Sequence, residues 1–269
     1  MSERPERPAK AYHNRPFLDG KDARALRILA EYLEPKGRFD RHHIEDTIVF
    51  MGSARIEPGA DEKARAGAAA GAADASQSGS DLSSYYHAAR ELARRLTEWS
   101  KTLDPGHRRF VVCTGGGPGI MEAANRGASD AGGENIGLTI SIPIEEFDNP
   151  FITSDLRFHF HYFFMRKFWF TYLAKAVVVF PGGFGTLDEL FELLTLVQTR
   201  KMHKPLPIVL FGDRYWKEVI NFDALVRYRT ISPGDVDLVF RTDSIDAAYN
   251  WIVGELLRKQ ALAQPGAML

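Results

Sequence analysis

The fold of this chain is decided by the stretch AVVVFPGGFGT at residues 176–186. Its first five residues, 176–180, form a continuous apolar run, which predicts a strand buried on both faces. The glycine-rich turn 181–186 follows directly, and the apolar spacing of 187–198 predicts a helix. This order is typical of an anion-binding loop, because glycine lets backbone N–H groups face an anion and a helix N-terminus attracts negative charge.

The same alternation of strand and helix extends over most of the chain. Further buried strands are expected at 48–51, 110–113, 135–142 and 207–211. Further helices are expected at 22–33, through 86–96, at 120–131 and through 251–256, with Asp81 or Ser83 as the cap of the second and Asp243 or Ser244 as the cap of the last. Apolar strands that alternate with amphipathic helices predict an α/β protein with a Rossmann-like, doubly wound parallel sheet and helices on both faces.

The chain divides into three parts by composition. We expect an N-terminal extension at 1–45, a Rossmann-like domain at 46–258 and a C-terminal tail at 259–269. Within the domain, residues 57–80 are dominated by Ala, Gly, Ser and Asp. This composition predicts a flexible insertion, since scattered glycines oppose a stable helix.

Composition excludes several classes of partner. The formal net charge of the 269 residues is −1, so no global basic field attracts nucleic acid or an anionic membrane, and phosphate binding requires a local site. The N-terminus has no apolar signal segment, and no apolar stretch is long enough to span a membrane. The single cysteine, Cys113, excludes an intramolecular disulfide. These features predict a cytoplasmic protein with no nucleic-acid or membrane partner.

Three glycine turns follow predicted strands, at 52–53, 115–119 and 182–185. Parallel sheets bind ligands beyond the carboxyl ends of their strands, near the point where the strand order reverses. The turn at 115–119 reads GGGPG, which matches neither the GxGxxG dinucleotide motif nor a P-loop. A bland alternative for each turn is tight packing between strand and helix, but three turns at strand ends favour a ligand crevice.

Three motifs together resemble the LOG ("Lonely Guy") family of cytokinin riboside 5′-monophosphate phosphoribohydrolases. They are GGGPGIMEAAN at 115–125, the pair Arg166-Lys167, and PGGFGTLDE at 181–189, and the turn at 52–55 looks like the first phosphate turn of the family. The length of the chain resembles the longer bacterial branch. Its members have often been labelled lysine decarboxylases, but no lysine paired with an acid for pyridoxal phosphate is evident here.

The resemblance implies hydrolysis of the N-glycosidic bond of a nucleoside 5′-monophosphate to a free base and ribose 5-phosphate, without a cofactor. It implies a homodimer or higher homo-oligomer and maps the catalytic pair onto Arg166 and Glu189. The residues expected to bind substrate or phosphate are Gly52, Ser53, Gly116, Gly117, Glu122, Met165, Lys167, Gly182, Gly183, Gly185 and Thr186.

Glu189 has a strong structural alternative. It lies three residues after Thr186, which places its carboxylate about one helical turn from the phosphate loop, where it can stabilise positive charge on a ribose. The same spacing is that of a capping box, in which Thr186 caps the helix and Glu189 bonds back to it. Asp188 points about 100° away around the helix, and Glu192 shares the face of Glu189.

The remaining candidates divide between function and packing. Arg166 suits either a phosphate or a departing base, and the aromatic residues around it, 163–170, form either a wall for the base or helix core. His159 and His161 lie on one face if their segment is a strand, but no third ligand is evident, so no metal site is expected. Cys113 is expected to be a small buried side chain rather than a nucleophile.

Two further functions remain open. One is a non-catalytic carrier of a nucleotide or of molybdenum cofactor with the same fold, which needs the phosphate loops but no catalytic carboxylate. The other is a structural protein whose glycine turns serve only packing. The sequence does not name the base that is released: cytokinin, adenine, guanine and pyrimidine bases all suit a flat apolar pocket.

Overall fold

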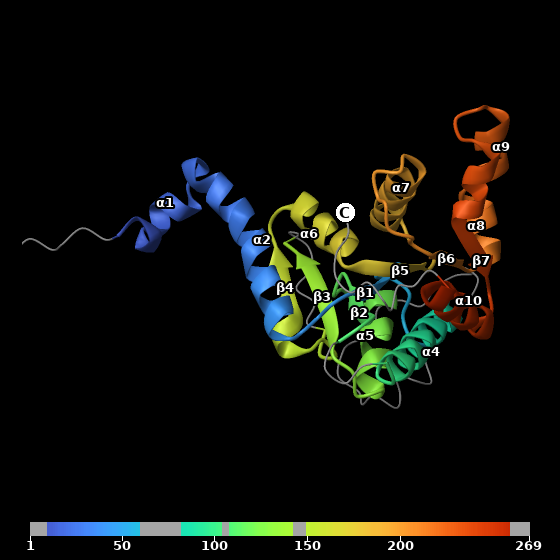
Figure 1. Cartoon of the computed structure of the whole chain (residues 1–269), viewed down its shortest axis with the longest axis horizontal. Coiled ribbons are helices and arrows are strands. Elements are labelled where there is room, and N and C mark those ends of the chain that lie inside the picture. Colours follow the sequence, from blue (N-terminus) through green and yellow to red (C-terminus); the bar gives the residue numbers. More distant parts are fainter. Residues whose placement is uncertain (1–9, 60–81, 104–107, 142–148, 259–269) are drawn as a thin grey trace, which may run out of the picture.

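In the computed structural model, which describes residues 10–59, 82–103, 108–141 and 149–258, seven parallel strands form one sheet between two layers of helices (Figure 1). The strands are β1 (Thr47–Met51), β2 (Val111–Thr114), β3 (Asn135–Ile140), β4 (Arg157–Phe160), β5 (Ala174–Val179), β6 (Ile208–Phe211) and β7 (Val239–Thr242). Their order across the sheet is β4-β3-β2-β1-β5-β6-β7. The predicted doubly wound α/β fold is therefore confirmed.

The helices sort onto the two faces of the sheet. They are α1 (Arg15–Asp19), α2 (Arg24–Arg41), α4 (Ser83–Ser100), α5 (Ile120–Asp130), α6 (Phe163–Tyr172), α7 (Phe184–Gln198), α8 (Asp213–Val219), α9 (Phe222–Arg227) and α10 (Ile245–Arg258). α4, α5 and α10 bury their apolar residues against one face, and α2, α6 and α7 bury theirs against the other (Figure 1). Every residue of β1 and β5 is buried, as continuous apolar strands between two helical layers require.

The strand order creates one switch point, between β1 and β5. From β1 the chain builds outward through β2, β3 and β4, then returns to the other side of β1 to form β5, β6 and β7. The neighbours β2, β1 and β5 are the strands that end in the three glycine turns. The fold thus brings turns that are distant in sequence to one edge of the sheet, at the position where such sheets bind ligands.

The first long helix is longer than predicted. The sequence suggests a helix at 22–33, but α2 continues through Pro35 to Arg41. A proline lacks the N–H that would bond to the carbonyl four residues earlier, which here is that of Glu31. The indole N–H of Trp169, in α6, donates to this carbonyl at 3.0 Å. A tertiary contact therefore satisfies the group that the proline leaves free, and it ties α2 to α6.

Several element boundaries also differ from the predictions. β2 begins at Val111, because Phe110 has a φ of +54°. Ser83 does not cap α4, whose cap residue is Leu82 and has no side-chain bond. The prediction for Ser244 is confirmed, since its hydroxyl accepts the N–H of Ala247 at 3.2 Å.

Some predicted segments lie outside the described residues, and some observed elements were not predicted. Asp81, most of the insertion at 57–80, the end of the third strand at 142 and the tail at 259–269 are outside the described ranges. β7, α8 and α9 were not predicted. They have only four to seven residues each, so their apolar residues are too few to form a clear periodic pattern. Across the described ranges, no helix is long and apolar enough to cross a membrane.

Candidate active site

Backbone hydrogen bonds join the three glycine turns directly. The N–H of Ser53, in the turn after β1, donates to the carbonyl of Pro181 at 2.9 Å. The carbonyl of Ser53 accepts the N–H of Ile120, at the start of α5, at 3.1 Å. A Cβ on Gly52 would lie 2.6 Å from the Ile120 side chain, so only glycine allows this approach. The turns therefore form one continuous surface at the carboxyl edge of the sheet.

The turn after β2 depends on glycine for its conformation. Gly116 and Gly119 have φ angles of +71° and +69°, which L side chains rarely adopt. A Cβ on Gly119 would collide with the carbonyl oxygen of Ser53, and one on Gly117 would lie 2.7 Å from Cε of Met121. The glycines of this turn thus allow both a left-handed backbone and close packing against the glycine turn that follows β1.

The helix after the third turn begins earlier than predicted, and this excludes the capping box. α7 starts at Phe184 rather than at residue 187, and its cap residue is Gly183. Thr186 is the third residue of the helix, so it is not the cap, and no side-chain hydrogen bond caps this helix. The carboxylate of Glu189 is bonded to Arg166 instead. The structural alternative for the pair Thr186 and Glu189 is therefore wrong.

The third turn has a packed side and an open side. The hydroxyl of Thr186 lies against Gly182, and the Tyr215 hydroxyl of α8 donates to the Gly182 carbonyl at 2.7 Å. A Cβ on Gly183 or Gly185 would have none of the described residues within 4 Å, apart from its own neighbours in the chain. These two glycines border free space at the N-terminus of a 15-residue helix, which is a suitable place for an anion.

Arg166 and Glu189 form an ion pair beside these turns. The Nη2 atom of Arg166 lies 2.7 Å from Oε1 of Glu189, and the side chains are only 12% and 13% exposed. The guanidinium group also lies over the rings of Phe163 and Phe170, at 5.5 and 5.4 Å from their centres. A Cβ on Gly115 would be 3.7 Å from Nη1 of Arg166. α6 and α7 thus place a fixed cation and a carboxylate at the second glycine turn.

Burial and charge act in opposite directions on Glu189. Burial raises the pKa of its carboxyl group, and the neighbouring Arg166 guanidinium opposes that shift. The Nε atom of Arg166 is buried and has no hydrogen-bond partner within the described part of the chain. Burial also raises the pKa of Cys113, with the charge of Glu189 acting in the same direction, so its thiol is a buried neutral group as expected.

Lys167 connects the same two helices further from the turns. Its Nζ atom lies 2.8 Å from Oδ2 of Asp188 and 2.9 Å from Oε2 of Glu192. Burial alone would lower the pKa of Lys167, but the hydrogen bonds to the two carboxylates outweigh it and the pKa is raised. Both acids are therefore committed to Lys167, while Glu189 faces Arg166.

The structure unites most of the predicted site residues but not all of them. One oxygen of Glu122 accepts the hydroxyl of Tyr86 at 2.7 Å, so this carboxylate is turned toward α4. Met165, a residue of α6, is buried in the hydrophobic core. Tyr86 and Tyr215, which hold Glu122 and Gly182, were not predicted. No spacing in the sequence marks them, because each contacts its partner across more than thirty residues.

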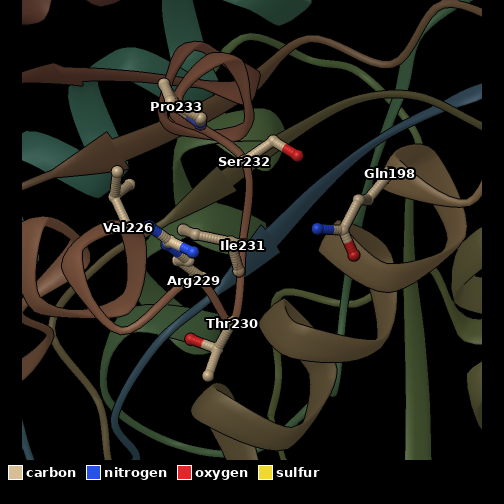
Figure 2. A pocket seen from close by; sticks show the side chains of 7 residues that line it. All are labelled: Gln198, Val226, Arg229, Thr230, Ile231, Ser232 and Pro233. Atoms are coloured by element: carbon tan, nitrogen blue, oxygen red, sulfur yellow. The ribbon is translucent and has the colours of Figure 1, made fainter.

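Other polar features lie outside this arrangement. Figure 2 shows a pocket of about 520 Å³ at the far end of α7 from Glu189. Its lining residues are Gln198, Val226, Arg229, Thr230, Ile231, Ser232 and Pro233, none of which was predicted as a site residue. His159 is in β4, with its ring nitrogens 2.9 Å from Thr139 and 2.7 Å from Ser141 hydroxyls. Among the described residues, no group of three or more His, Cys, Asp or Glu could hold a metal ion.

Fold and site together define a class of protein. The fold is that of an α/β protein whose three joined glycine turns lie at the switch point of a doubly wound parallel sheet, where such proteins bind ligands. The buried Arg166 and Glu189 pair adds a carboxylate to that site.

Comparison with known proteins finds a matching family model and several relatives. A family model described as "Possible lysine decarboxylase" matches residues 121–252. The pyrimidine/purine nucleotide 5′-monophosphate nucleosidase of Escherichia coli (strain K12) is 32% identical over 123 residues, which cover 40% of this chain and 26% of that protein. The cytokinin riboside 5′-monophosphate phosphoribohydrolase LOG of Oryza sativa subsp. japonica is 30% identical over 141 residues, covering 52% of this chain and 53% of that protein. The chain is similar to members of the LOG family, in agreement with the resemblance of its motifs.

The chain spans only about a quarter of the bacterial relative and about half of the plant relative. Among solved structures, the X-ray structure of a structural-genomics target aligns with a TM-score of 0.49 at 21% identity, covering 78% of this chain and 99% of that chain. The molybdenum cofactor carrier protein of Chlamydomonas reinhardtii aligns with a TM-score of 0.47 at 18% identity, covering 79% and 99%. These structural resemblances carry no statement about activity.

Proposed function

We propose that this protein hydrolyses the N-glycosidic bond of a nucleoside 5′-monophosphate to a free base and ribose 5-phosphate. The observation that carries the proposal is the buried ion pair of Arg166 and Glu189, placed beside three joined glycine turns at the switch point of the sheet. The turns suit a phosphate, and the carboxylate suits the positive charge that develops on a ribose during cleavage.

The geometry suggests a role for each group. The 5′-phosphate binds at the open side of the turn that holds Gly183 and Gly185, at the N-terminus of α7. The ribose then reaches toward Glu189, whose carboxylate stabilises the oxocarbenium-like state and orients a water molecule. The water oxygen bonds to C1′ and loses a proton, while the C1′–N bond breaks and its electron pair leaves with the base, which takes up a proton.

Arg166 has two tasks in this proposal. Burial raises the pKa of Glu189, and the positive charge of Arg166 acts in the opposite direction, which favours the ionised carboxylate. The unpartnered Nε atom of Arg166 is a buried donor that a phosphate or base oxygen would satisfy. A single fixed guanidinium thus supports both the carboxylate and the bound nucleotide.

The names of the relatives support the same class of reaction. Both the bacterial and the plant relative are named for cleavage of nucleoside 5′-monophosphates. The name of the family model, lysine decarboxylase, has less support from the site. Lys167, the lysine next to Arg166, has a raised pKa and is held by two carboxylates, whereas a Schiff-base lysine must give up its proton.

A substrate panel tests the proposal and names the base. The purified protein is incubated with AMP, GMP, CMP, UMP and a cytokinin riboside 5′-monophosphate, and free base and ribose 5-phosphate are quantified. We expect release from at least one of them. Absence of release from the whole panel, together with binding of a monophosphate, would favour a nucleotide carrier.

Glu189→Gln tests the role of the carboxylate. The substitution retains the shape of the side chain but removes its charge, so turnover should fall by roughly 10²–10³-fold while binding of ribose 5-phosphate changes little. Asp188→Asn is the matched control, because Asp188 is the adjacent acid and is 61% exposed. Near-normal turnover in the Glu189 variant would show that this carboxylate only pairs with Arg166.

We also propose that the chain forms a homodimer or larger homo-oligomer. α6 and α7, which carry the ion pair, expose the side chains of Phe163, Phe164, Phe184 and Phe191, and Phe184 is 92% exposed. Apolar surface of this kind favours a protein contact. Light scattering after size-exclusion chromatography measures the mass in solution, and a monomer at micromolar concentration would contradict the proposal.

A further inference from the structure

A buried polar network lies beneath the second glycine turn. It consists of the side chains of Thr114, Asn125, Asn135 and Asn149, all of which are buried. They come from the end of β2, from α5, from the start of β3 and from the segment that precedes β4. Such a network is costly unless each group is paired, so its arrangement is specific.

Asn125 is the centre of this network, and all four of its hydrogen-bonding positions are used. Its Oδ1 atom accepts from the hydroxyl of Thr114 at 2.6 Å and from Nδ2 of Asn149 at 3.0 Å. Its Nδ2 atom donates to Oδ1 of Asn135 at 2.8 Å and to the carbonyl of Ile136 at 3.2 Å. The amide therefore has one orientation that satisfies its neighbours.

Thr114 links this centre to the turn. Its hydroxyl gives its only proton to Asn125, which leaves the oxygen free to accept the N–H of Gly116 at 2.9 Å. Gly116 has a φ of +71° and lies within a run of three glycines, the residue type with the greatest backbone freedom. The three glycines have no side chains to restrain this part of the turn, so the hydrogen bond from the Gly116 N–H to the Thr114 hydroxyl is a restraint that the network beneath supplies.

We infer that Thr114 and Asn125 are positioning residues for the proposed reaction: they hold the turn at 115–119 in the conformation that receives the sugar phosphate. This inference rests on the proposed function, because it assumes that the turn contacts the substrate. The position of the turn also matters for Arg166, whose Nη1 atom lies close to the Cβ position of Gly115. Neither positioning residue is assigned a part in the bond cleavage.

Thr114→Val tests the inference with little change of shape. It removes the acceptor for the Gly116 N–H and the donor to Asn125, whereas Thr114→Ser retains the hydroxyl. Thr97→Val is the matched control, because the Thr97 hydroxyl is buried in α4 and has no hydrogen-bond partner in the part of the chain that the structure describes. The measurements are the Kd of ribose 5-phosphate by calorimetry, KM and kcat for the best monophosphate, and hydrogen exchange of the Gly116 amide.

We expect Thr114→Val to raise the Kd and KM at least tenfold, with kcat changing less than threefold, and to speed exchange of the Gly116 amide at least tenfold. Thr114→Ser and Thr97→Val should stay within threefold of the wild type in all three measurements. Asn125→Asp, which puts acceptors where two donors are needed, should act in the same direction as Thr114→Val. If Asn125→Asp does not fold, the Thr114 variants decide.

Two results would overturn the inference. One is a Thr114→Val protein with unchanged Kd, KM and Gly116 exchange. The other is a Thr97→Val protein with the same losses, which would show that any change in buried polarity has this effect. If the wild type neither binds ribose 5-phosphate nor cleaves a monophosphate, the proposed function fails, and exchange at Gly116 alone then decides whether the network holds the turn.

Discussion

Buried ion pairs lie at both ends of the parallel strands: at the carboxyl ends, called here the carboxyl edge, and at the amino ends, called the amino edge. The two pairs differ in what surrounds them. At the carboxyl edge, Arg166 and Glu189 meet at 2.7 Å beside glycines that border free space. At the amino edge, Asp46 and Arg109 also meet at 2.7 Å, and Asp46 accepts the N–H of Phe110 as well. Asp46 and Arg109 are enclosed by the protein, whereas Arg166 and Glu189 lie beside two glycines whose Cβ positions meet none of the described residues.

Lys204 completes the contrast. It is 4% exposed at the amino edge and donates to the carbonyls of Thr171 and Tyr172 at 2.6 and 2.7 Å. Those carbonyls are at the C-terminal end of α6, where a cation is favoured. Two of its three donors are thus used within the protein, while Nε of Arg166 has no partner among the described residues. A buried charge alone does not mark a site; a buried charge with an unused donor and adjacent space does.

The largest expected effect on stability comes from breaking the Asp46–Arg109 ion pair at the amino edge. Asp46→Asn removes a fully buried carboxylate that pairs with Arg109 and accepts the N–H of Phe110, and it should lower the free energy of unfolding by about 3–5 kcal/mol. Chemical denaturation measures this loss. Asp19→Asn is the control, since the Arg15–Asp19 pair is largely exposed and should contribute less than about 1 kcal/mol. Equal losses in the two variants would show that the buried Asp46–Arg109 pair contributes no more to stability than the exposed pair does.

A smaller effect comes from the protonation of Lys204. Burial, aided by the charge of Lys175, lowers the pKa of Lys204 to about 7. In the unfolded chain a lysine has a pKa near about 10.4. Between these values the unfolded chain binds more protons than the folded protein, so the free energy of unfolding should rise with pH, by at most about 1.4 kcal/mol per pH unit.

Denaturation at pH 7, 8 and 9 checks this dependence on pH. Lys204→Met should flatten the rise, and Lys201→Met, at an exposed position three residues earlier, should leave it unchanged. A wild-type stability that falls over this range would show that the folded protein keeps the proton of Lys204 up to pH 9, and a rise that survives in the Lys204 variant would show that another group causes it.

The smallest effect on stability concerns the open edge. Gly185→Ala adds a Cβ that meets nothing within 4 Å, at the second residue of α7, so the fold should tolerate it or gain up to about 1 kcal/mol. The same Cβ would occupy the proposed phosphate site, so the Kd of ribose 5-phosphate should rise at least tenfold by calorimetry.

Gly119→Ala provides the opposite case. Its φ of +69° and the contact of its Cβ position with the Ser53 carbonyl should make this variant unstable in thermal denaturation. If Gly185→Ala binds ribose 5-phosphate as well as the wild type does, the open side of the third turn is not the phosphate site.

Much of the fold follows from local sequence pattern. The strand at 174–179 and the helix at 184–198 are within three residues of their predicted bounds, because a continuous apolar run and a 3.6-residue spacing are local signals. The reach of α2 past Pro35 was not predictable, since it depends on a donor from Trp169, more than a hundred residues later. Spacing alone also could not decide whether Glu189 belongs to a capping box or to an active site, because both roles place it three residues after Thr186.

The resemblance to the LOG family pointed to Arg166 and Glu189, whereas the residue pattern by itself determined the parallel α/β class and the three glycine turns. These depend on residue type and short spacing, which act within one strand, turn or helix. Only the tertiary structure decided that the turns share backbone hydrogen bonds, that Glu189 faces Arg166 rather than Thr186, and that Thr114 and Asn125 lie beneath Gly116. Those contacts depend on the strand order, which brings distant segments to one edge of the sheet and lets packing choose the partner of each polar group.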